Sequence, residues 1–305
     1  MLLKNLQHIL LHAIGVTSIS FMLVPKAMAV APIVCDSCSL AATEVVNSQN
    51  RSTERQWLWG VGAASLLDTY LSPLTYKGMD LAWLNRTERQ ARWGRGNVTV
   101  LGLYNAHFAY AKSPTDDGKY MDAELTVAGG WHYNWFMSHP TNNAAISPLV
   151  PTSLSDWRVA VGGLVETSGG FTYNTRNGNN PAQGRLGVSL MASAIVERNF
   201  WFFKQRAKAR VQLDAQMVGV QFSPVYGQSY YEIFSLGHSQ GVVHFTHPGN
   251  CPSARILTMV TLPIKKSQVS LGYLGDVRQS KLGGLKRHAW RNMFMVGYTR
   301  NITRL

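Results

Sequence analysis

Four residues in one stretch of the chain have side chains that bind metal ions in many proteins. They are His238, His244, His247 and Cys251, and imidazole and thiolate groups are common zinc ligands. Neither a second cysteine nor a carboxylate completes the set nearby. Scattered loop residues are therefore the simpler interpretation, and no metal site is predicted.

Catalytic chemistry has equally weak support in the sequence. A hydrolase needs a serine or cysteine activated by a base that a third group orients. Serine and histidine are present, and Gly237-His238-Ser239-Gln240-Gly241 fits the spacing G-x-S-x-G, but it lies in a predicted loop or hairpin and not at the strand-to-helix turn on which this signature depends. A phosphate-cradling loop and a paired-carboxylate motif are also missing. No catalytic residue and no cofactor is predicted, and an enzyme remains the minor alternative.

The elements that would position any site have a period of two residues, which is typical of β-strands. In 157–173, for example, Trp157, Val159, Val161, Val165, Phe171 and Tyr173 share one face, opposite Arg158 and Glu166. Ten segments alternate in this way. They are 56–70, 78–92, 97–112, 124–135, 157–173, 185–198, 207–217, 255–265, 268–280 and a last strand through 294–298. Residues 228–247 are an eleventh and twelfth candidate, as a hairpin.

Such strands fit either a soluble barrel or sandwich with the apolar face inside, or a membrane barrel with the apolar face toward lipid. The strands are longer than the usual 5–6 residues of soluble proteins, and aromatic residues gather at the ends of the apolar faces, as at lipid–water interfaces. Short and long connections also roughly alternate, with long loops at 71–77, 113–118, 174–184, 222–254 and 281–288. We therefore predict an all-β fold, a closed antiparallel transmembrane β-barrel of about 10–12 strands. The aromatic residues in question are Trp57, Trp59, Trp131, Tyr133, Trp135, Phe171, Tyr173 and Tyr298.

The second face of each strand then lines the lumen and is rich in charges of both signs. An unpaired charge in a narrow lumen is costly, so these groups are expected to pair across strands. The alternative is a lining that selects solutes, because ten to twelve strands leave a narrow pore at most. The predicted lumen residues are Asp68, Asp80, Arg86, Glu88, Glu124, His132, Arg158, Glu166, Arg185, Glu197, Arg210, Asp214, Asp276 and Arg278.

The N-terminus has the features of an export signal. Lys4 precedes a mostly apolar stretch, and Ala27-Met28-Ala29 is a cleavage site of the A-x-A type. We predict a signal peptide over 1–29, a periplasmic tail over 30–54 and the barrel over 55–305. A retained anchor helix and lipidation of Cys35 are the alternatives. The pairing of Cys35, Cys38 and Cys251 stays open, although an exported chain is exposed to oxidising conditions.

The formal net charge is +13, from 29 Lys and Arg against 16 Asp and Glu. The basic residues are scattered, without an interleaved basic and aromatic patch, so nucleic acid is not predicted as a partner. A basic rim that faces outer-membrane lipid and lipopolysaccharide fits the charge equally well. Part of this rim is expected in 281–305, which carries Lys281, Lys286, Arg287, Arg291, Arg300 and Arg304 and no acid.

Several segments resemble a family of predicted outer-membrane barrels from Bacteroidetes, catalogued as a domain of unknown function with the number 3316. The matching stretches include 67–74, 130–135 (Gly-Trp-His-Tyr-Asn-Trp), 173–183, 222–234 and 272–276. The resemblance implies a barrel in the outer membrane of a Gram-negative bacterium. It implies no activity, so no functional residue is carried over. Residues 137–155 look like an insertion relative to that family.

Loops carry function more often than scaffolds do, so the candidate binding surface lies on them. Three interpretations follow: a binding, adhesion or envelope-assembly scaffold with a protein or glycan ligand, a narrow pore or passive transporter for small solutes, and an outer-membrane hydrolase. The first is favoured, and neither the ligand nor the oligomeric state is fixed by the sequence. The loop residues concerned are Asn177, Asn179, Asn180, Tyr226, Gln228, Tyr230 and Tyr231.

Overall fold

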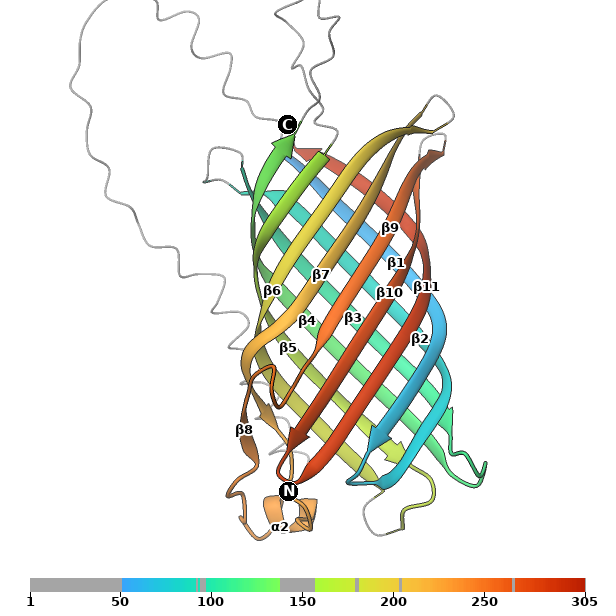
Figure 1. Cartoon of the computed structure of the whole chain (residues 1–305), viewed down its shortest axis with the longest axis vertical. Coiled ribbons are helices and arrows are strands. Elements are labelled where there is room, and N and C mark those ends of the chain that lie inside the picture. Colours follow the sequence, from blue (N-terminus) through green and yellow to red (C-terminus); the bar gives the residue numbers. More distant parts are fainter. Residues whose placement is uncertain are drawn as a thin grey trace, which may run out of the picture. The chain divides into compact units, whose positions relative to one another are not determined.

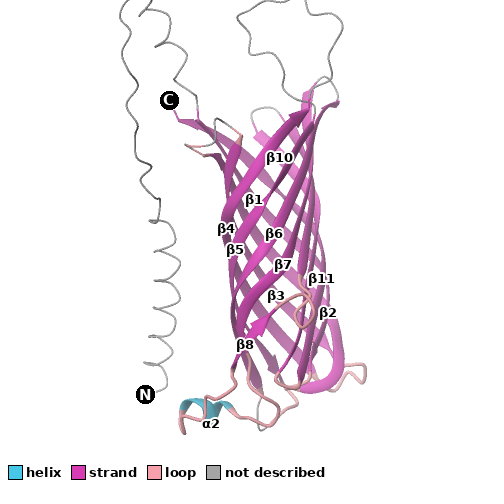
Figure 2. Ribbon diagram, turned by 60° about the vertical axis from the view of Figure 1, so that its left-hand side comes forward, coloured by secondary structure: helices cyan, strands magenta, loops and turns pink. Residues whose placement is uncertain are grey.

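A computed structural model describes residues 51–91, 93, 97–137, 157–178, 181–202, 205–264 and 267–304. The predicted signal peptide, Cys35 and Cys38 lie outside these residues. The described chain is almost entirely β-structure (Figures 1 and 2). Residues 231–238 belong to a separate unit, and they contain most of the short helix α2 (Tyr230–Phe234). None of the helices in the described part has the length and apolar character of a membrane span.

Ten long strands make up the barrel, and each pairs antiparallel with its neighbours. All ten alternating segments of the sequence are strands, and most extend further than predicted, because pairing continues beyond the apolar part. The first strand already begins within the predicted tail. The strands are β1 (Arg51–Asp68), β2 (Ser72–Gln90), β3 (Val98–Lys112), β4 (Lys119–Met137), β5 (Trp157–Asn174), β6 (Ala182–Phe202), β7 (Gln205–Phe222), β9 (Ala254–Ile264), β10 (Ser267–Leu282) and β11 (Leu285–Arg304).

The first and last strands close the sheet. β1 pairs with β11 along its whole length, from Arg51 opposite Arg304 to Asp68 opposite Arg287. Closure gives every strand two neighbours, so that no long edge of backbone N–H and C=O groups is left bare. The barrel therefore has ten strands, at the lower end of the predicted range.

The strand opposite β7 is interrupted. β8 (Val243–Thr246) pairs with 219–222 of β7, and β9 pairs with 208–215. Seven residues, 247–253, thus face only three residues of β7, and the excess folds into a turn in which the Cys251 N–H donates to the His247 carbonyl over 2.8 Å. The predicted hairpin over 228–247 is wrong, because β8 is its only strand and α2 takes up 230–234.

Side-chain polarity is inverted relative to a soluble barrel. Val61, Leu81, Phe108 and Phe294 are about half exposed on the outer surface, whereas Asp80 on the inner face is fully buried. An apolar exterior with a polar interior is the arrangement of barrels that span a membrane. The soluble alternative, with the apolar face inside, is excluded by this orientation.

The connections differ from the prediction of short turns at one end and long loops at the other. We name the end where β1 starts and β11 finishes the terminus end, and the opposite end the loop end. The loop-end connections 69–71 and 283–284 are short, because the expected loops at 71–77 and 281–288 are mostly strand. Gly283 and Gly284 have φ of +57° and +80°, which a two-residue hairpin turn needs and glycine adopts freely.

Candidate functional site

The structure places all fourteen predicted lumen residues inside the barrel. Twelve of them are buried, and Arg158 and Arg185 have side chains only 12% and 7% exposed. They do not form one site, because they divide into two groups at different heights. Sequence reasoning missed seven further ionisable groups that belong to the same networks: Glu54, Asp122, His107, Lys208, Arg255, Arg287 and Arg291.

The first group, the terminus-end charge cluster, is centred on Arg210. Its guanidinium Nη1 lies 2.6 Å from Glu54 Oε1, and its Nη2 lies 2.6 Å from Glu197 Oε2. Arg86 donates to Glu88 over 2.7 Å, and Arg158 also pairs with Glu88. Each charge thus has at least one opposite partner, which offsets part of the cost of taking it out of water.

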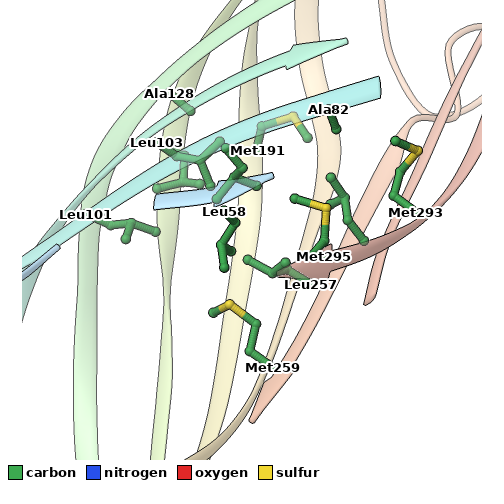
Figure 3. Close-up of a cluster of buried hydrophobic side chains, with 13 residues drawn as sticks. Leu58, Ala82, Leu101, Leu103, Ala128, Met191, Leu257, Met259, Met293 and Met295 are labelled. Carbon is green, nitrogen blue, oxygen red and sulfur yellow. The ribbon is translucent and has the colours of Figure 1, made fainter. Parts of the chain in front are cut away.

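Next to this cluster, on its loop-end side, an apolar layer occupies the lumen. Nine of the ten strands contribute to it, and Met293, Met295 and Leu58 are fully buried there (Figure 3). Met side chains adapt to irregular gaps, which suits the centre of a barrel where strands cross at an angle. The apolar layer comprises Leu58, Ala82, Leu84, Leu101, Leu103, Ala128, Leu164, Met191, Leu257, Met259, Leu274, Met293 and Met295.

The second group, the loop-end charge cluster, lies beyond the apolar layer. Arg255 bridges Glu166 and Asp214 through contacts of 2.9 and 2.8 Å, and Arg291 lies 2.6 Å from Asp122. The other members are Asp68, Asp80, His107, Glu124, Arg185, Asp276, Arg278 and Arg287. A second apolar group lies still closer to the loop end, and in it the rings of Tyr76 and Tyr120 stack with centroids 3.6 Å apart.

The layers follow one another along the barrel, except on β7, where the buried Gln212 accepts from Arg86 and donates to Asp214 and so links the two charge clusters. On β2, for example, Glu88 and Arg86 come first in the barrel, then Leu84 and Ala82, then Asp80. A cavity of about 40 Å³ lies beside Arg278 and Cys251, which is room for roughly three waters. The described side chains therefore fill the lumen at several levels.

His132 has a different role from the other predicted lumen residues. Its Nε2 lies 2.8 Å from the Ser193 hydroxyl, which in turn donates to Asp214 over 2.6 Å. The serine stands between histidine and carboxylate, whereas nucleophilic catalysis needs the histidine between them. The arrangement is a buried hydrogen-bond chain and not a catalytic triad.

The histidine and cysteine side chains of 244–251 make separate contacts. His244 Nε2 lies 3.1 Å from the Ser223 carbonyl, and the Cys251 thiol faces Gln216 at 3.6 Å. Among the described residues, no group of three His, Cys, Asp or Glu side chains is arranged to hold a metal. Burial raises the pKa of the free Cys251 thiol, which keeps it protonated and unreactive at neutral pH.

The connections at the loop end are held together by tyrosine and asparagine side chains. The Tyr230 hydroxyl donates to the Gly184 carbonyl over 3.1 Å and accepts from the Gly184 N–H over 2.6 Å. The Tyr70 hydroxyl donates to the Gln228 carbonyl, and the Tyr70 ring meets the Tyr230 ring edge-on at 5.9 Å. Asn177 donates to the Leu71 carbonyl. These contacts fix 69–71, 175–178 and 223–230 to one another and to the barrel wall.

The predicted loop residues therefore separate into two kinds. Gln228, Tyr230 and Asn177 stabilise the loops, whereas Tyr226 is 76% exposed and held by its backbone N–H, which donates to the Gly283 carbonyl. Tyr231 is also exposed, within the separate unit. Asn179 and Asn180 lie outside the described residues. Burial raises the pKa of Tyr230, so its hydroxyl keeps the proton it donates.

These features define a class of protein: a closed, ten-stranded antiparallel β-barrel with an apolar exterior and a filled, charged interior. The chain belongs to the family described as "Protein of unknown function (DUF3316)", whose model matches residues 22–305. This confirms the family number that the sequence motifs indicate. No curated protein matches the sequence.

Comparison with solved structures finds other barrels at low similarity. The transport unit of the autotransporter AIDA-I from Escherichia coli is 8% identical, with a TM-score of 0.37, over 86% of this chain and 93% of that chain. The attachment invasion locus protein Ail of Yersinia pestis is 12% identical, with a TM-score of 0.29, over 81% and 98%. These values carry no inference, and the fold assignment rests on the strand pairing itself.

Proposed function

We propose that this protein is an outer-membrane β-barrel that conducts no solute and acts through its loop end, as a binding or envelope-assembly scaffold. The observation that carries the proposal is the layered filling of the lumen. Two charge clusters and the apolar layer between them occupy the path that a solute would take. A barrel of this kind offers its outer surface and its loops as the parts available for function.

The apolar exterior supports placement in a membrane. Rings of aromatic residues border the apolar surface at both ends, with Trp57 stacked on Tyr298 at the terminus end and Phe171 and Tyr173 exposed near the loop end. An even number of strands brings both ends of the barrel to the same side, which in outer-membrane barrels is the periplasm. The loop end then faces the outside of a Gram-negative cell.

The loop end has the properties of a binding surface. Its connections are fixed to one another by the contacts of Tyr70, Tyr230 and Asn177, so little conformational entropy is lost when a ligand binds. Tyr226 projects from this fixed surface, and an exposed aromatic ring packs well against a sugar face or a partner's apolar side chain. Exposed Lys77, Lys119 and Lys281 at the same end suit lipopolysaccharide phosphates.

The filled lumen predicts an electrically silent barrel. The purified full chain, reconstituted into a planar bilayer at neutral pH, is expected to give no stepwise current, because buried apolar side chains and paired charges occupy the lumen at successive levels. A known porin inserted under the same conditions provides the positive control. Reproducible unitary currents from the folded barrel would contradict the scaffold proposal and support the pore.

The exposed ring of Tyr226 is expected to account for much of the binding at the loop end. On a printed array of bacterial and host glycans, Tyr226→Ala should bind at least about tenfold less than the native chain, because one buried aromatic contact contributes about 1–3 kcal/mol. Tyr104→Ala, which removes an exposed ring from the wall, is the matched control and should bind normally. Equal binding by Tyr226→Ala would exclude this ring from the site.

A further inference from the structure

The exterior of the barrel is basic at the terminus end. The outward-facing residues Arg55, Arg89, Arg198 and Arg300 are all exposed there. In contrast, the described carboxylates on the strands, such as Glu54, all lie on the lumen face. Acidic side chains of the described wall therefore do not balance the charges of Arg55 and Arg300.

Two of these arginines form a compact pair, which we name the arginine patch: Arg55 and Arg300. Arg55 of β1 lies directly opposite Arg300 of β11. Like charges directly opposite in a sheet are destabilising, so this arrangement favours an anionic partner from outside the barrel.

The arginine patch also lies at a defined height. Arg55 and Arg300 come two residues beyond Trp57 and Tyr298, whose rings stack with centroids 4.8 Å apart. Interfacial aromatic rings mark the level of the lipid headgroups, and two residues of strand correspond to about 7 Å. Arg198 of β6 lies directly opposite Trp157 of β5, and its guanidinium is 5.0 Å from the centre of that ring.

We propose that the arginine patch binds the phosphate groups of anionic phospholipid, of the phosphatidylglycerol class, in the inner leaflet of the outer membrane. Guanidinium groups match phosphate oxygens in charge and in paired hydrogen-bond geometry. The inference rests on the proposed membrane orientation, which places the terminus end at the periplasmic leaflet, where phospholipid and not lipopolysaccharide is found.

The barrel itself provides a matched control at its other end. Lys281 and Lys286 also lie directly opposite each other, face outward and are exposed. Lys286 is four residues beyond Trp290, the last exposed aromatic residue of β11 at that end, hence about 14 Å along the strand. This lysine pair is therefore expected to lie beyond the phospholipid headgroups, where electrostatic attraction is screened by salt.

The test measures the thermal unfolding midpoint of the full chain in a nonionic detergent, titrated with phosphatidylglycerol or phosphatidylcholine. Phosphatidylglycerol should raise the midpoint more than phosphatidylcholine does. In Arg55→Gln/Arg300→Gln this difference should vanish, with apparent affinity for phosphatidylglycerol reduced roughly thirtyfold, since each arginine near an anionic surface contributes about a factor of five. Lys281→Gln/Lys286→Gln should retain the native response.

Two outcomes would overturn the inference. The first is an undiminished phosphatidylglycerol response in the arginine variant, whose folded state is verified by its heat-dependent gel mobility. The second is a stronger response to lipopolysaccharide that the arginine substitutions abolish. Failure of the proposed placement in a membrane would be seen separately, as a native chain that stays folded and monodisperse without detergent.

Discussion

Replacing Arg255 by methionine is expected to lower the free energy of unfolding by about 3–5 kcal/mol. The guanidinium is 1% exposed and joins Glu166 on β5 to Asp214 on β7, through contacts of 2.9 and 2.8 Å. Methionine has a similar volume, so the loss is mainly electrostatic: two buried carboxylates lose a shared cation. The measurement is equilibrium unfolding by guanidinium chloride in lipid vesicles, monitored by tryptophan fluorescence.

Two variants separate this effect from a general loss of packing. Arg255→Met/Asp214→Leu removes a carboxylate together with the cation, and it should recover part of the stability that Arg255→Met loses. Lys112→Met breaks an exposed ion pair with Asp116 and should leave stability unchanged. If Arg255→Met unfolds at the native denaturant concentration, the lumen is hydrated enough for water to replace the guanidinium, and the filled-lumen interpretation is incorrect.

Val61→Arg is expected to prevent efficient insertion, or to lower the free energy of unfolding in lipid by about 2–4 kcal/mol. Val61 faces outward near the middle of β1, between Phe294 of β11 and Leu81 of β2, and all three are about half exposed. A charge at this level would have to leave water for acyl chains. The fraction of barrel that folds into vesicles, read from its gel mobility without boiling, gives the result.

Val61→Leu is the matched control, since it changes the side chain at the same position without adding charge, and it should fold like the native chain. The expected loss of stability arises from contact with acyl chains. Val61→Arg should therefore lower the free energy of unfolding much less in detergent micelles, where the guanidinium can reach water. An arginine variant that inserts and unfolds like Val61→Leu would show that the apolar exterior does not face acyl chains.

The strands could be predicted from the sequence because one face of each is apolar over many residues. The apolar layer in the lumen could not be predicted in this way, and β3 shows the reason. Leu101 and Leu103 point inward, yet they lie on the same strand as outward-facing Tyr104 and Phe108, so both faces are apolar in mid-strand. A two-residue period assigns a face only where the two faces differ in polarity, and in the middle of this barrel they do not.

The individual lumen charges were also accessible from the sequence, but their partners were not. Arg255 and Glu166 are 89 residues apart, and only closure of the sheet brings them together. The sequence places Arg287 and Arg291 on a basic rim, because the segment 281–305 carries six basic residues and no acid. The two-glycine turn at 283–284 instead extends β11 as far as Leu285 and turns both arginines toward Glu124.

Pairing of β1 with β11 has a consequence for how the molecule assembles. Arg51 pairs with Arg304, 253 positions further along the chain, so the barrel cannot close until the C-terminal strand has arrived. Before that step the sheet has two edges with unpaired backbone N–H and C=O groups, and acyl chains offer these groups no hydrogen bonds. A chain truncated within β11 should consequently fail to insert stably into a bilayer, since its sheet cannot close.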